Sequence, residues 1–242
     1  MTKSYSTGLS YFVNIDIVKK SNFINLPNLY LLILLIGLGF CLINCQSKSK
    51  EVITLPFLGK PQVKQIVTNG ISKDTLLPHR IPNFEIHNQY GKNFGTKDLI
   101  GKVHLTEFFF TSCPSVCPKV AKQMTAIHQQ FAGEKNFALV SITLDSKHDT
   151  PTKLFDYAEK KSVNHSNWYF LNGDKDTVYD LAEEGYFVAA YQDTTRQNDN
   201  IMHDGVVVLV DQQGHIRGMF DGKEQATVSK VENAVKQLLL DL

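Results

Sequence analysis

The chain has 242 residues, of which 43% are hydrophobic, and a formal net charge of +1. This length and apolar content suffice for one well-buried domain with an additional segment. The near-neutral charge, without a cluster of basic residues, argues against nucleic acid as a partner.

The N-terminal part of the chain has the pattern of a membrane-targeting segment. Residues 29–43 carry no charge and follow Lys19 and Lys20, which favours a cytoplasmic N-terminus and export of the rest. The run is short for a spanning helix, which needs about 20 apolar residues. Its end, Leu-Ile-Asn-Cys45, resembles a bacterial lipoprotein box with Cys45 as the lipidated residue. An uncleaved membrane anchor, a cleaved free product and a plain apolar helix that includes Cys41 remain alternatives.

Three parts of the chain are expected. Residues 1–45 form a signal or membrane-anchor segment, and residues 46–79, with mixed Ser, Lys, Pro and Gly, form a tether and an irregular extension. Residues 80–242 form the folded domain. Every version of the anchor places the part after residue 45 outside the cytoplasm, where thiols tend to be oxidised. The expected location is a bacterial cell membrane, with the domain on the extracytoplasmic side.

Within the folded domain, strands alternate with helices. Runs of β-branched and aromatic residues predict strands at 103–110, 137–144, 168–171 and 206–210. Turn residues predict hairpins at 84–94 and 206–220. Helical spacing of apolar residues predicts helices at 120–131, 151–160, 177–184 and 228–238. This order implies a single α/β domain with a mixed central sheet flanked by helices.

Cys113 and Cys117 are the most informative residues, because they lie where a predicted strand passes into a helix. Two thiols at this spacing can share a soft metal ion or close into a disulfide. A helix start lowers the pKa of a thiol, and Pro118 suits the first helical position. Two thiolates and one imidazole make a trigonal copper(I) site. His203, just before a core strand, is the candidate third ligand, with a surface loop histidine as the alternative.

Two aspartates follow the strand next to the cysteine-bearing one. Asp145 ends that strand and is a candidate for orienting a metal ligand, although a loop or capping role is an equal alternative. Asp149, followed by Thr150 and Pro151, is interpreted as a structural N-cap with proline just inside the next helix.

Residues 80–242 resemble the SCO/SenC (Sco-type) copper-chaperone family of cytochrome c oxidase assembly. The similarity lies in the strand that leads into T-S-C-P-S-V-C-P at 111–118, in D-S-K-H-D-T-P at 145–151, and in the histidine before the strand that ends in Val210-Asp211. The resemblance implies a thioredoxin-like fold, a membrane tether, and copper, as Cu⁺ or Cu²⁺, held by Cys113, Cys117 and His203. It also implies the copper-bearing subunit of the oxidase as a partner.

Three functions are compatible with these residues. The first is a membrane-tethered copper chaperone that delivers copper to cytochrome c oxidase, or reduces its copper-site cysteines, and that needs a thiol reductase as a second partner. The second is an enzyme, a thiol–disulfide oxidoreductase using Cys113 and Cys117 as the redox pair. The third is a tethered interaction module with a structural disulfide. Loss of His203 distinguishes the first two, because only the chaperone needs it.

Overall fold

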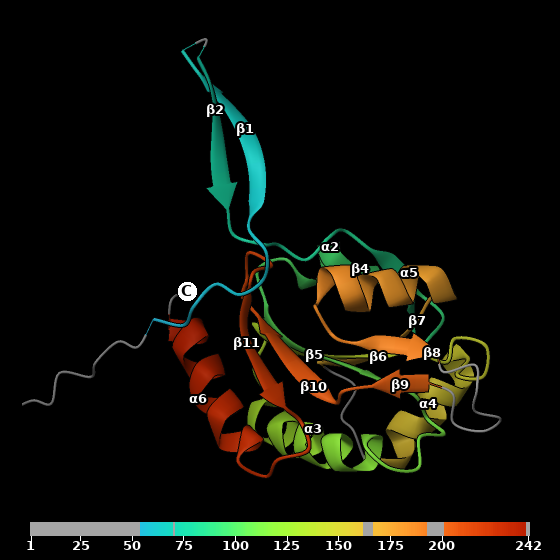
Figure 1. The fold of residues 1–242 in the computed structure, drawn as a ribbon. Helices are drawn as coiled ribbons and strands as arrows, with labels where there is room; N and C mark the ends of the chain where they lie inside the picture. Colours follow the sequence, from blue (N-terminus) through green and yellow to red (C-terminus); the bar gives the residue numbers. More distant parts are fainter. Residues whose placement is uncertain (1–53, 70, 162–166, 193–200, 241–242) are drawn as a thin grey trace, which may run out of the picture. The chain divides into compact units, whose positions relative to one another are not determined.

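The computed structural model describes residues 54–69, 71–161, 167–192 and 201–240 (Figure 1). The predicted anchor segment, including Cys41 and Cys45, lies outside these residues. Among the helices described, none combines the length and the apolar character that a membrane crossing requires.

The core of the domain is a seven-stranded mixed sheet in the order β11-β10-β5-β6-β7-β3-β4. Its centre consists of three parallel strands: β5 (Val103–Phe109), β6 (Phe137–Thr143) and β7 (Trp168–Asn172). Antiparallel strands extend it on both sides: β10 (Val206–Val210), β11 (Ile216–Asp221), β3 (Glu85–Asn88) and β4 (Asn93–Gly95). The predicted α/β fold with a mixed central sheet is confirmed.

Helices cover both faces of this sheet, and neighbouring residues of β5 show which helix lies where. Phe109 packs on Tyr157 of α4 (Pro151–Lys160), with ring centroids 5.5 Å apart. Phe108 packs on Tyr186, which follows α5 (Lys175–Asp180) and the π-helical turn η1 (Leu181–Gly185). Because successive strand residues point to opposite faces, α4 and α5 cover different faces.

The remaining helices complete the two layers. Helix α3 (Cys117–Phe131) lies on the α4 face, since its His128 ring contacts Trp168 on the side that also carries Phe170 and Tyr157. Helix α6 (Thr227–Leu240) packs beside α3, opposite α5 (Figure 1). The short helix α2 (Thr96–Leu99) follows β4. Every residue of β5 and β6 is buried, as expected for parallel strands covered on both faces.

Two pairs of strands were not expected from the sequence. β1 (Gln62–Thr68) and β2 (Ile71–Leu77) form an antiparallel hairpin in the region where an irregular extension was predicted. β8 (Ala190–Gln192) and β9 (Ile201–His203) form a second, very short ladder. Three-residue strands carry too little periodicity to be recognised in a sequence, and β1 and β2 lack the buried face that produces alternation.

Candidate metal centre

Cys113 lies in the connection from β5 to α3, and Cys117 is the first residue of α3, both at the carboxyl edge of the parallel strands. After β5 ends, the chain turns so that the backbone N–H of Cys113 donates to the carbonyl of Phe110 at 3.3 Å. Val116 is the residue before the helix, and Cys117 is its first helical position, so Pro118 occupies the second position and not the predicted first. Neither position has an intrahelical acceptor for its N–H, and proline is therefore tolerated there.

Three potential metal ligands converge at this edge. The sulfurs of Cys113 and Cys117 and a ring nitrogen of His203 all lie within 4.8 Å of one another. The Sγ atom of Cys117 is 3.2 Å from Nε2 of His203, and the backbone N–H of Cys117 donates to Sγ of Cys113 at 3.4 Å. Both thiols are free. The three predicted ligands are thus brought together.

His203 reaches the thiols because β9 pairs with β8 directly before β10 enters the sheet. His203 lies opposite Ala190 in that ladder, and its ring packs edge-on against Phe110 with centroids 6.0 Å apart. Among the residues described, its buried Nδ1 atom has no hydrogen-bond partner, whereas Nε2 points to the sulfur. The ring is therefore held by packing, with one nitrogen directed at the dithiol.

The two thiols differ strongly in acidity. A hydrogen bond from Cys117 lowers the pKa of Cys113 to about 3, and His203 and nearby backbone N–H groups stabilise its thiolate further. The pKa of Cys117 is raised by the hydrogen bond that it donates to Cys113 and by burial. The pair therefore shares one proton, with Cys113 as the thiolate. Thiolates are the form that ligates metals and attacks disulfides.

Solvent reaches the site from the Cys113 side. Cys113 is partly exposed, whereas Cys117 is only 3% exposed. A small cavity of about 90 Å³ opens beside them and is lined by Phe110, Cys113, Ser115, Val116, Ile201, Met202 and His203. An ion or a reactive partner can therefore approach Cys113 and His203 first.

A buried carboxylate beneath the site was not anticipated. Glu107 lies on β5, is 3% exposed, and accepts a hydrogen bond from the Ser141 hydroxyl at 2.6 Å. Burial raises its pKa to about 7, although the Ser141 hydrogen bond and the charge of His203 act in the opposite direction. Its charge in turn raises the pKa of Cys117. The available signal was a carboxylate inside a strand that was predicted to be buried.

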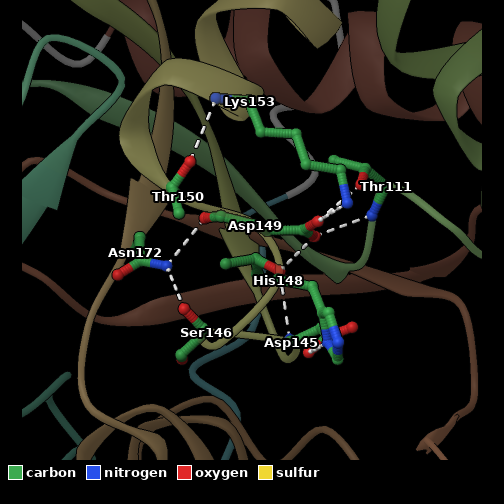
Figure 2. A network of polar contacts seen from close by, with 9 residues as sticks. Thr111, Asp145, Ser146, His148, Asp149, Thr150, Lys153 and Asn172 are labelled. Atoms are coloured by element: carbon green, nitrogen blue, oxygen red, sulfur yellow. Dashed lines mark hydrogen bonds and ion pairs between the residues drawn. The ribbon is translucent and has the colours of Figure 1, made fainter.

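The two predicted aspartates have different surroundings (Figure 2). The Asp145 carboxylate pairs with Nδ1 of the exposed His148 at 2.8 Å, so its action on a metal ligand stays a prediction. The N-cap interpretation of Asp149 is wrong, because Thr150 caps α4 by accepting from the backbone N–H of Lys153. Asp149 is instead completely buried and binds Thr111, two residues before Cys113.

The donor set fits a soft metal ion. Two cysteine sulfurs and an imidazole nitrogen suit copper(I), and a metal that binds both sulfurs must displace the proton that the two thiols share. Fold and site together define a class: an α/β domain with a dithiol at a helix start and a histidine delivered from a separate strand.

Comparisons with known proteins identify the family. The SCO1/SenC family model matches residues 73–239, and the chain therefore belongs to the SCO1/SenC family. The SCO1 protein homolog of Bacillus subtilis is 26% identical over 66% of this chain and 83% of its own length. A SCO1/SenC family lipoprotein from Bacillus anthracis is 28% identical, with a TM-score of 0.62 over 66% of this chain and 95% of that structure.

A third relative extends the likeness in fold. The structure of Bradyrhizobium japonicum ScoI with copper bound is 23% identical to this chain, with a TM-score of 0.54. The match covers 64% of this chain and 98% of the ScoI structure. At this identity the likeness supports the fold alone, and the fold matches the mixed α/β architecture described above.

Proposed function

We propose that this protein is a membrane-tethered, extracytoplasmic copper chaperone for cytochrome c oxidase. Cys113, Cys117 and His203 are the ligands that hold the copper. The N-terminal segment is the tether, with Cys45 as its lipidated residue. The copper-bearing subunit of the oxidase receives the metal, and a separate thiol reductase keeps the two cysteines reduced.

The observation that carries this proposal is the convergence of three ligands from two distant segments. A redox dithiol alone would not need an imidazole nitrogen 3.2 Å from its buried sulfur. Support also comes from membership of the SCO1/SenC family and from the copper-bound relative with the same fold.

Copper release follows from the exposure of the site. A thiolate or imidazole of the receiving protein reaches the metal through the cavity beside Cys113 and His203 and replaces these ligands one at a time. The copper keeps its oxidation state in this exchange. Oxidation of the two cysteines to a disulfide removes both thiolate ligands, so the same pair makes copper loading dependent on the redox state.

A second candidate function, thiol–disulfide oxidoreductase, is favoured by the asymmetry of the thiols. The Cys113 thiolate attacks a partner disulfide, forms a mixed disulfide and releases one partner thiolate. Cys117 then loses its proton and attacks Sγ of Cys113, which releases the second partner thiolate. The partner gains two electrons, and this chain keeps a Cys113–Cys117 disulfide. Reduction of the copper-site cysteines of the oxidase is one form of this reaction.

His203→Ala separates the two functions. In cells that carry only this variant, the oxidase is expected to contain much less copper, because one of three ligands is missing. Reduction of a small model disulfide by the purified variant is expected to stay close to the wild-type rate. Copper content of the isolated oxidase and the exchange rate are the measurements, with His87→Ala, an exposed histidine on β3, as the control. Normal oxidase copper in the His203 variant would contradict the chaperone function.

A further inference from the structure

A buried polar network joins the turn that carries Cys113 to the start of α4 (Figure 2). At its centre is the carboxylate of Asp149, which is 0% exposed. It accepts from the backbone N–H of Thr111 at 2.8 Å, from the Thr111 hydroxyl, and from the Thr143 hydroxyl at 2.7 Å. The ammonium of Lys153 lies 3.2 Å away. A buried carboxylate needs such partners because its desolvation is otherwise uncompensated.

The network is itself held in place. The side-chain amide of Asn172, at the end of β7, donates to the backbone carbonyls of Ser146 and Asp149 at 2.9 and 2.7 Å. The backbone N–H of Asp149 donates to the carbonyl of Asp145 at 2.9 Å. The loop between β6 and α4 is therefore fixed to the sheet independently of the cysteine turn, and Asp149 offers the turn a rigid acceptor.

Two of the four donors to Asp149 come from one residue of the cysteine turn. Thr111 follows Phe110, whose ring packs on His203 and whose carbonyl accepts from the N–H of Cys113. Displacing Thr111 would leave a buried carboxylate without half of its donors. The turn is thus held at the point from which both Phe110 and Cys113 are oriented.

We propose that Asp149 is a positioning residue for the metal centre, acting through Thr111 to fix the Cys113 turn relative to His203. This inference deepens the proposed function, because it concerns the geometry of the same three ligands. Two residues from separate segments, the threonine before Ser112-Cys113 and the aspartate before Thr150-Pro151, then act together to hold the cysteine turn.

The test compares two threonines that each donate one hydroxyl to the same carboxylate. Thr111→Val removes the hydroxyl donor on the cysteine turn. Thr143→Val is the control: it removes the donor on β6, together with the acceptor for the backbone N–H of Asp145 at 3.1 Å. Thr111→Ser restores the hydroxyl. Hydrogen exchange of the peptide that contains Cys113 is measured in the reduced, metal-free, full-length chain, and copper(I) affinity is measured by chelator competition. If Thr111→Val does not fold, Thr111→Ala and Thr143→Ala replace the pair.

Thr111→Val is expected to speed exchange around Cys113 and to weaken copper binding about tenfold, as is typical when a group that supports ligands is lost. Thr143→Val is expected to do neither, and Thr111→Ser is expected to recover both. Equal effects of the two valine variants on the cysteine turn, or no rescue by serine, would overturn the inference. If the wild-type chain binds no copper, the proposed function fails, while the exchange comparison still decides the role of Asp149.

Discussion

Replacing Cys113 with serine is expected to lower the copper(I) affinity of the reduced chain by more than about 100-fold, which exceeds the usual cost of losing a group that merely supports ligands. Cys113 is the thiolate of the pair and the more exposed ligand, and a serine hydroxyl is a hard oxygen donor that suits copper(I) poorly. Anaerobic competition with a coloured copper(I) chelator measures this change.

Ser115→Ala is the control for the Cys113 variant. Ser115 lies in the same turn and lines the same cavity, but it offers no sulfur or imidazole to a metal. Its variant is expected to bind copper(I) as the wild type does. A Cys113 variant with wild-type affinity would show that the metal is held elsewhere.

Glu107→Gln is expected to stabilise the metal-free, reduced protein at about pH 8 by up to about 3 kcal/mol, the energy of a pKa raised from 4.5 to about 7. The cause is burial: the carboxylate is 3% exposed, and its charged form is poorly solvated. Glutamine keeps the oxygen that accepts from Ser141 and removes the charge. The free energy of unfolding in urea, measured at about pH 5 and pH 8, tests this expectation.

The pH range in which Glu107 affects stability follows from the direction of its pKa shift. Because the folded pKa of Glu107 is the higher one, the folded state binds more protons than the unfolded state between pH 4.5 and about 7. The contribution of Glu107 to the free energy of unfolding therefore falls as the pH rises through this range. The glutamine variant has no carboxyl group at this position and lacks this pH-dependent contribution.

The charged and titratable groups that act with Glu107 come from several elements. They are Cys117 on α3, Tyr157 on α4, Lys161 after α4 and His203 on β9. Glu85→Gln, an exposed change, is the control and is expected to show no such pH-dependent gain. An equal effect of Glu107→Gln at both pH values would contradict a raised pKa in the folded protein.

Much of the fold could be predicted because its buried strands and amphipathic helices have strong local signatures. The run 103–110 appears as β5, and the proline at 151 begins α4 as expected. The hairpin β1–β2 and the ladder β8–β9 could not be predicted, because their pairing depends on contacts between segments and not on a local pattern.

The same distinction applies to the site. Cys113 and Cys117 are recognisable from spacing alone, whereas the position of His203 left a surface loop histidine as an alternative to a ligand. Nothing local shows that β9 brings it to the sulfurs, and the family resemblance favoured the ligand. The position of Glu107 next to the site could not be predicted, because it lies within a strand whose residues are all buried. Asp149 resembled a cap in sequence, since the motif does not reveal which of two adjacent residues faces the cysteine turn.

The most direct test of the account is an anaerobic copper(I) titration of the full-length chain in two states, with Cys113 and Cys117 reduced and with the pair oxidised to a disulfide. We expect one tightly bound copper per reduced chain and none per oxidised chain. Protons are released on loading because the dithiol must give up its shared proton. A reduced chain that binds no copper tightly would contradict the chaperone function and leave the thiol–disulfide oxidoreductase as the better explanation of the site.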